Sequence, residues 1–398
     1  MAAFPQELGS IESELAEGTP HSHLPVIALS TRIPALDGLR GIAILLVLLC
    51  HSVFELHTSS KILSRFLAVG RLTWSGVDLF FVLSGFLIGG ILLDANSSPR
   101  YFTTFYARRA YRILPLYAVV LMLFSLRYVT SHESAGPLGS FSHSSIPWIS
   151  YVTFTQNIWM ALLGTFGAGA MAATWSLAVE EQFYLTVPFL IRKIDRPRLA
   201  FVLLSIIVAA PLVRTALHLF FAHGNFACYV LMPCRSDALS LGVLCALLVR
   251  TKRWWEFLLS RRPALCWLTG FFFLGLIPLT FCGEELSTLM VTIGYSWLAL
   301  FYSGCLLIAI TSANMKIQLL LCNQRLMQLG GLAYCTYLLH LPLMEACRRL
   351  LGLGFTYSST GTQFAGGLLG VLLTLAVAKF SWTFFEKPLL RRGHTYKY

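Results

Sequence analysis

The sequence predicts an all-α, polytopic membrane protein with about ten transmembrane helices and both termini in the cytoplasm. Hydrophobic residues make up 56% of the chain and charged residues only 12%, whereas soluble domains contain about 25% charged residues. A chain with this composition is expected to lie in a lipid bilayer. Because one helical span needs about 20 apolar residues, the chain of 398 residues has room for roughly ten spans with short loops.

Apolar stretches bounded by charged residues or turn residues mark the expected spans. They lie near residues 41–57, 75–94, 111–130, 172–190, 198–222, 236–250, 264–282, 289–312, 331–350 and 365–386. The segment 146–170 is also apolar, but it is rich in glycine towards its end. We expect it to be re-entrant or interfacial, because counting it as a span would upset the charge pattern of the loops.

The chain is expected to contain one membrane domain, over residues 34–392. Residues 1–33 mix Glu, Pro, Ser and Gly without an apolar core, which indicates a disordered cytoplasmic tail and neither a signal peptide nor a span. Residues 393–398 are expected to form a short cytoplasmic tail, and no soluble domain is expected after the last span. No repeat of the kind that many transporters contain is visible in the sequence.

The formal net charge of +12 suggests nucleic acid as one possible partner, but the basic residues lie in short clusters between apolar segments. Such clusters are typical of cytoplasmic loops near anionic lipid. With the N-terminal tail in the cytoplasm, most of them, including Arg192–Arg198 and Arg250–Arg262, lie inside. The expected partner is therefore the lipid bilayer and not nucleic acid.

The ten cysteines are scattered mostly through apolar segments, without Cys-x-x-Cys or Cys/His ligand spacing. This distribution argues against a metal site and against a redox framework. Most of them are expected to be small packing residues. Cys228 and Cys234 are expected near the outer surface, where a disulfide between them stays an alternative.

Ionisable side chains at membrane depth cost several kcal/mol in most estimates, so each one is a hypothesis for a functional site. The expected spans contain seven such candidates: His51, Asp78, Glu180, Glu181, Arg214, Asp237 and His340. Arg214 has no explanation from the sequence alone.

Arg40 and His51 are 11 residues apart, which returns to within roughly 20° of the same helix face. The separation along the helix is about 16 Å. Arg40 is therefore expected at the cytoplasmic rim, with His51 near the middle of the bilayer. The alternative is that Arg40 is a snorkelling anchor and that His51 bonds a neighbouring carbonyl group. Asp37, one turn before Arg40, is expected to pair with it.

Glu180 lies roughly half-way down its expected span, at the same depth as His51. A buried carboxylate beside an imidazole fixes its tautomer and stabilises the imidazolium ion. Tyr184 shares the face of Glu180, whereas Glu181 points about 100° away. The alternatives are a structural His–Glu pair or a proton relay, which a transporter would also need.

Arg109 and Arg112 fall at i and i+3 at the expected start of a helix. Guanidinium groups bind phosphate in a bidentate way, and a helix N-terminus adds its dipole. The alternative is ordinary positive-inside charge, which is the preferred interpretation for Arg108. In the second expected span, a stripe of small residues that includes Ser84 favours close helix packing or the passage of a ligand chain.

Together these segments resemble the acyltransferase-3 family of membrane acyltransferases, which includes acetylases of O-antigen, peptidoglycan and macrolides. The resemblance covers the chain from about Ile33 to Arg392. The residues that carry it are Asp37-Gly38-Leu39-Arg40-Gly41 with His51, Gly76 through Phe86, Arg109 with Arg112, Thr174 through Leu177 with Tyr184, Arg235 through Leu239 with Gly242, Tyr334 with Tyr337 and His340, and Trp382 with Glu386-Lys387-Pro388.

The resemblance implies an enzyme that transfers an acyl group, usually acetyl, from cytoplasmic acyl-CoA to a hydroxyl group of a glycan or another extracytoplasmic acceptor of the cell envelope. Acyl-CoA would be a co-substrate, and no permanently bound cofactor or metal is expected. The family's first-helix arginine and histidine correspond to Arg40 and His51. Its phosphate-binding arginines correspond to Arg109 and Arg112, and we add Ser84 to this donor site.

We hypothesise that His51, oriented by Glu180, is the general base for the acceptor hydroxyl, because a thiolate is a good leaving group and only the hydroxyl needs activation. A covalent acyl-histidine is the less favoured version. The residues assigned to the acceptor are Asp78, Tyr184, Arg235, Asp237 and His340. For Asp78 and the Arg235/Asp237 pair, the alternative is that they tie helices together.

Two other classes of protein stay open. A proton-coupled transporter of a small polar substrate would also use buried His, Glu and Asp residues, but the Arg109 and Arg112 pair suits a phosphorylated donor better. A receptor or scaffold has no use for a stripe that contains both Arg40 and His51.

Overall fold

The computed structural model describes residues 33–54, 56, 58–130, 145–282, 284–312, 314–351 and 360–398. The expected N-terminal tail lies outside these residues except for Ile33. Within the described ranges the chain forms helices and no strand, which confirms the all-α fold class.

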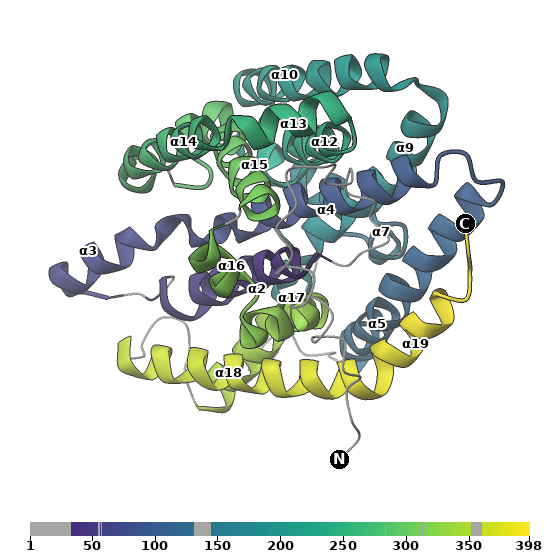
Figure 1. Cartoon of the computed structure of the whole chain (residues 1–398). Helices are drawn as coiled ribbons and strands as arrows, with labels where there is room; N and C mark the ends of the chain where they lie inside the picture. The colour runs from purple at the N-terminus through teal and green to yellow at the C-terminus, as the bar shows by residue number, and fades with distance from the viewer. Residues whose placement is uncertain are drawn as a thin grey trace.

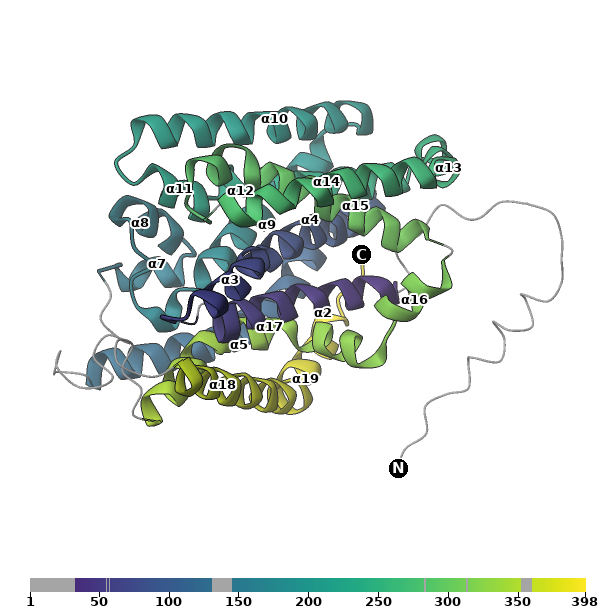
Figure 2. The same cartoon turned by 90° about the vertical axis from the view of Figure 1, so that its left-hand side faces the viewer.

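Ten long helices correspond to the ten expected spans. They are α2 (Pro34–Leu49), α4 (Gly76–Asp94), α5 (Tyr101–Thr130), α9 (Thr174–Lys193), α10 (Arg196–Phe220), α12 (Met232–Val249), α14 (Arg262–Cys282), α15 (Tyr295–Thr311), α17 (Gln324–Leu350) and α18 (Thr360–Ser381). In Figures 1 and 2, α10, α12, α14 and α15 lie on one side of the bundle and α5, α17 and α18 on the other, with α2, α4 and α9 between them.

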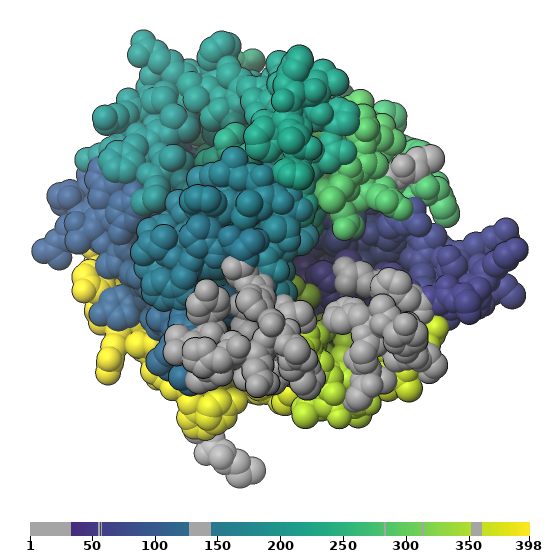
Figure 3. All heavy atoms as spheres, turned by 180° about the vertical axis from the view of Figure 1, so that it is seen from behind, coloured from purple at the N-terminus to yellow at the C-terminus, as the bar shows by residue number. Residues whose placement is uncertain are grey.

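Short helices connect the long ones. They are α3 (Lys61–Val69), α7 (Trp148–Val152), α8 (Gln156–Leu163), α11 (Gly224–Val230), α13 (Lys252–Ser260), α16 (Met315–Leu321) and α19 (Lys387–Gly393). Two 3₁₀ turns, Arg71–Ser75 and Gly169–Met171, and three π turns, Cys50–Phe54, Met290–Gly294 and Trp382–Glu386, complete the helical elements of the described chain. In Figures 1 and 3, α3 projects from the rest of the bundle.

Eight helical stretches in the described part of the chain are long and apolar enough to cross a membrane. The exposed side chains of α10 and α14 include Leu212, Phe271 and Leu274, which is typical of a surface that contacts lipid. The expected spans at 172–190 and 331–350 form α9 and α17, which are not among the eight. Polar residues such as Glu180 and Glu181 lower the hydropathy of α9. The structure therefore supports a multi-pass membrane protein with eight clear spans.

The segment 146–170 does not cross the bundle as one helix. It contains α7 and α8, with 5 and 8 residues, which are about 8 and 12 Å long at 1.5 Å per residue. Both are too short for a hydrocarbon core of about 30 Å. This confirms that the segment is not a further span.

A close helix crossing joins α4 to α12 and depends on two glycines. A Cβ atom on Gly85 would lie 2.0 Å from the carbonyl oxygen of Leu239, and one on Gly242 would lie 2.2 Å from that of Val82. The small residues of the second span therefore pack helices together, as one of the two expected roles requires.

Replacing Gly242 with valine is expected to force α4 and α12 apart and to lower the thermal unfolding midpoint of the protein in detergent. Overpacking of this kind costs typically about 1–3 kcal/mol. The matched control is Gly270→Ala, because a Cβ atom there would meet nothing within 4 Å. Equal midpoints for the two variants would contradict the packing role of Gly242.

Candidate active site

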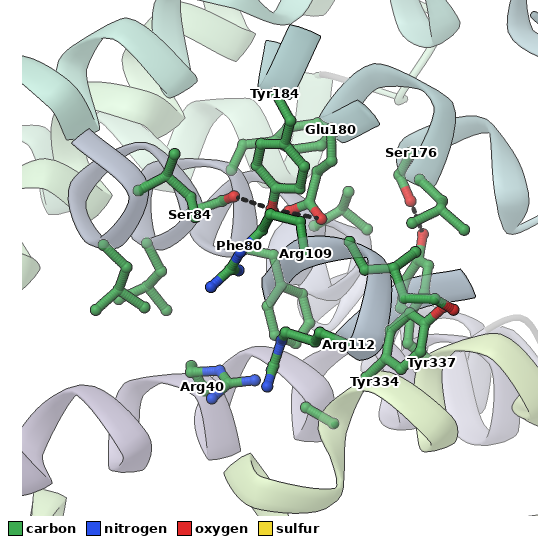
Figure 4. Close-up of a pocket in the computed structure, with 18 of the residues that line it drawn as sticks. Arg40, Phe80, Ser84, Arg109, Arg112, Ser176, Glu180, Tyr184, Tyr334 and Tyr337 are labelled. Atoms are coloured by element: carbon green, nitrogen blue, oxygen red, sulfur yellow. Dashed lines mark hydrogen bonds between the residues drawn. The ribbon is translucent and has the colours of Figure 1, made fainter. Parts of the chain in front are cut away.

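Five long helices, α2, α4, α5, α9 and α17, enclose a cavity of about 280 Å³, which we call the inner cavity (Figure 4). Most of its apolar lining residues come from α4, between Val77 at one end and Ile91 at the other. Its polar lining residues are Arg40, Ser84, Arg109, Arg112, Ser176, Glu180, Tyr184, Tyr334 and Tyr337. The cavity thus combines a charged region with an apolar wall.

Three arginines line the inner cavity, and Figure 4 shows them turned towards one space. Arg40 lies 3.8 Å from Asp37 in a contact between guanidinium and carboxylate, which confirms the expected pairing. The Nε atom of Arg109 is buried and has no hydrogen-bond partner among the residues that the structure describes. In the described part of the chain, Glu180 supplies the one carboxylate that lines this cavity. The excess of positive charge makes the cavity suitable for an anion.

Glu180 belongs to a polar cluster on the wall of the inner cavity. The Tyr184 hydroxyl donates to Oε2 of Glu180 over 3.3 Å and lies 2.8 Å from Oγ of Ser84. The spacing of four residues on α9 accounts for the first contact, as the sequence predicted. Glu181, on another face of the helix, does not line this cavity.

A second cavity of about 370 Å³, the outer cavity, lies at the other end of α4. Its lining includes the histidines His51 and His340 and the aromatic rings of Trp74, Trp175 and Tyr229. Four charged residues complete the polar lining: Glu285, Glu345, Arg348 and Arg349. Aromatic surface with a few polar groups is typical of a site for a small organic molecule.

The two cavities share Val77 and Tyr337 as lining residues. The hydroxyl of Tyr337 lies 2.6 Å from Oγ of Ser176 and donates to the carbonyl oxygen of Ala173 over 3.3 Å. These contacts hold the phenol ring between helices α9 and α17. A molecule that extends from the inner cavity to the outer one must therefore pass Tyr337.

His51 lies in the π turn Cys50–Phe54 at the end of α2. Single π turns inside longer helices are frequent at functional sites. The ring centroids of His51 and His340 are 5.1 Å apart, and Nη2 of Arg348 donates to the carbonyl oxygen of His51 over 2.7 Å. The two histidines therefore form one cluster in the wall of the outer cavity.

The tautomer of His340 follows from its contacts. Its Nδ1 atom lies 2.6 Å from the carbonyl oxygen of Tyr337. A carbonyl oxygen only accepts hydrogen bonds, so Nδ1 carries the proton of the neutral ring. Nε2 is then the basic nitrogen of that ring.

Two expectations about helix bounds, and about where residues lie along their helices, are wrong. The first span is Pro34–Phe54 and not 41–57, so His51 lies three residues before its end and not near its middle. Helix α5 begins at Tyr101 and not near 111, so Arg109 and Arg112 lie beyond its first turn. The helix dipole, which acts within the first turn, does not contribute there, and both arginines act from inside the bundle.

His51 and Glu180 line different cavities, His51 the outer and Glu180 the inner one. The expected contact between them stays a prediction.

Asp78 and Arg235 form a buried ion pair of 2.7 Å between α4 and α12, and each side chain is 1% exposed. The Arg235 guanidinium lies 4.0 Å from the ring centroid of Tyr295, and Trp175 and Tyr229 contact it less closely. The pair thus stands behind the aromatic wall of the outer cavity. Neither residue lines the cavity itself, so this geometry favours the alternative that the pair ties helices together.

A second buried ion pair explains why Arg214 lies inside the bundle. Its Nη1 atom lies 2.9 Å from Oδ2 of Asp237 and donates to the carbonyl oxygen of Cys234, while Nη2 donates to Ser296. Asp237 therefore pairs with Arg214 and not with Arg235. Cys228 and Cys234 are both buried free thiols in the structure, and the alternative of a disulfide between them is wrong.

The junction at Tyr337 and the aromatic wall of the outer cavity were not predicted from the sequence. The available signal for Tyr337 was its spacing of three residues from both Tyr334 and His340, which places all three side chains along one side of a helix. Trp74 and Tyr229 gave no signal, because they come from segments that are distant in the sequence.

The model of the acyltransferase domain family matches residues 33–379 of the chain. The acyltransferase MdmB of Streptomyces mycarofaciens is 28% identical over 390 residues, which cover 90% of this chain and 92% of MdmB. The peptidoglycan O-acetyltransferase OatA of Listeria monocytogenes is 26% identical over 384 residues, 91% of this chain. The matched region spans only 56% of the length of OatA. No solved structure matches the chain.

Proposed function

The chain belongs to the acyltransferase domain family whose model matches residues 33–379, and from this premise we propose a specific reaction. The protein moves an acyl group, most simply acetyl, from acyl-CoA on the cytoplasmic side to a hydroxyl group of an acceptor on the other side of the membrane. The observation that carries the proposal is the pair of cavities that meet at Tyr337, one cationic and the other lined by two histidines.

The inner cavity receives the donor. Arg40, Arg109 and Arg112 supply positive charge for its phosphates. The apolar wall formed by α4 suits the uncharged pantetheine chain, which would run from the arginines towards Tyr337. Ser84 and Tyr184 offer hydroxyl groups along this path. Glu180 offsets part of the arginine charge in this cavity, and its predicted role in orienting His51 is a separate part of the proposal.

The outer cavity receives the acceptor. His51 takes the proton from the acceptor hydroxyl as its oxygen attacks the thioester carbonyl carbon; the C–S bond then breaks and CoA leaves as a thiolate that takes up a proton. His340 supports His51, because its neutral tautomer presents a basic nitrogen within the same cluster. A covalent acyl-histidine is the less favoured route.

The aromatic rings and charged groups of the outer cavity suit a polyhydroxylated acceptor such as a carbohydrate. OatA is named for peptidoglycan, which is such an acceptor. The proposal therefore includes glycan O-acetylation in the cell envelope. The protein would lie in the plasma membrane, the inner membrane of a bacterium, with both termini in the cytoplasm.

The test is an assay of the purified protein with acetyl-CoA and a set of carbohydrate acceptors. We expect release of free CoA thiol that depends on the acceptor, together with an acceptor whose mass has increased by one acetyl group. A proton-coupled transporter would release no thiol. Acceptor uptake into proteoliposomes without thiol release would contradict the proposal.

A further inference from the structure

A third cavity, of about 190 Å³, lies between α5 and the segment 394–398, which follows α19. We call it the mouth cavity. Its lining residues include Ile91, Arg109 and Arg112, and these three residues also line the inner cavity. The mouth cavity therefore continues the inner cavity at the end away from Tyr337.

Four contacts hold the segment 394–398 against α5, along which it runs in Figure 1. The Nε and Nη2 atoms of Arg108 donate to the carbonyl oxygen of Tyr396 over 3.0 and 2.7 Å. Oγ1 of Thr104 donates to the carbonyl oxygen of Lys397 over 3.0 Å. The Arg108 guanidinium also lies over the Tyr398 ring, 5.0 Å from its centroid. Arg108, which the sequence assigned to membrane topology, therefore anchors this segment.

The mouth cavity is cationic. Arg108, Arg109, Arg112 and His394 line it, and no carboxylate side chain is among its lining residues. Burial first, and then Arg108, Arg109 and Arg112, lower the pKa of His394. A ligand group that binds stably in the mouth cavity therefore carries negative charge.

Tyr398 adds an aromatic surface to this charge. Tyr398 lines the mouth cavity together with the arginines, so that its ring is available to stack against a planar ring of the ligand. An anion alone needs no such surface. Positive charge beside an aromatic ring, at the entrance to a longer apolar cavity, suits a nucleotide that continues into an uncharged chain.

We propose that the mouth cavity binds the nucleotide end of the donor, with the phosphates between Arg108, Arg109 and Arg112 and the base against Tyr398. This inference rests on the proposed function, because it concerns the same donor. It assigns to the segment 394–398 a role in donor affinity.

The experiment compares CoA, which carries the nucleotide, with pantetheine, which lacks it. Binding of each compound to the purified protein in detergent is measured by calorimetry for the wild type and for Tyr398→Ala. Stacking of a base on an aromatic ring contributes about 1–3 kcal/mol, so we expect the substitution to weaken CoA binding by about 5- to 100-fold and to leave pantetheine binding unchanged. Tyr398→Phe, which keeps the ring, should restore most of the lost affinity.

Arg391→Gln is the matched control, because Arg391 is an exposed residue of α19 that does not line the mouth cavity. The inference is overturned if Tyr398→Ala binds CoA as tightly as Arg391→Gln does, or if CoA and pantetheine binding weaken equally. Thiol release separates the two proposals. If CoA binding depends on Tyr398 while no acceptor causes thiol release, the inference stands and the proposed function fails. If an acceptor causes thiol release while CoA binding does not depend on Tyr398, the proposed function stands and the inference fails.

Discussion

Replacing His51 with glutamine is expected to abolish detectable acyl transfer. Loss of a general base lowers the rate by about 10²- to 10⁴-fold. The thiolate of CoA is a good leaving group, so the acceptor hydroxyl is the reactant that needs a base. The imidazole of His51 lines the outer cavity beside His340, where an acceptor would bind. The initial rate of thiol release from acetyl-CoA, in the presence of an active acceptor, measures the effect.

The binding of CoA separates a catalytic role of His51 from a structural one. His51 does not line the inner cavity, so His51→Gln should bind CoA with the affinity of the wild type. His223→Gln is the matched control, since this histidine is exposed and lines none of the three cavities. A near-normal rate of acyl transfer by His51→Gln would contradict the proposed mechanism and would make His340 the stronger candidate for the general base.

The contacts between residues of the same helix were predictable, because helix periodicity determines them. A spacing of three or four residues brings Asp37 to Arg40 and Glu180 to Tyr184, and both contacts follow from the sequence alone. The spans were predictable for a similar reason, since their apolar stretches are long. The ends of the helices were less predictable. For example, nothing in the sequence of residues 101–110 indicates that this segment is helical and continues into the apolar stretch that follows it.

The contacts between distant segments were not predictable, because charge alone does not select a partner. Asp237 is two residues from Arg235, but its partner is Arg214, on another helix. Asp78 pairs with Arg235 across 157 residues of sequence. The division into two cavities has the same origin, since it depends on how α2, α9 and α17 pack. The depth of a residue along its span did not predict which cavity it lines, so nothing in the sequence indicated that His51 lines the outer cavity and Glu180 the inner one.

Replacing both Arg109 and Arg112 with glutamine is expected to weaken the binding of CoA by about 100-fold or more. Hydrogen bonds to charged groups contribute about 1.5–3 kcal/mol each, and each 1.4 kcal/mol changes affinity about tenfold. Both side chains line the inner cavity and the mouth cavity, so both can reach the phosphates. Calorimetry in detergent measures the affinity directly.

The control for this double variant must remove the same charge elsewhere on the same side of the protein. Arg391→Gln with Arg392→Gln does so, because both residues are exposed on α19 and line none of the three cavities. A non-specific effect of charge would weaken CoA binding equally in the two double variants. Binding that is unchanged in Arg109→Gln with Arg112→Gln would assign these arginines to membrane topology. A loss confined to that variant, with pantetheine binding retained, would place the phosphates of the donor at the arginines.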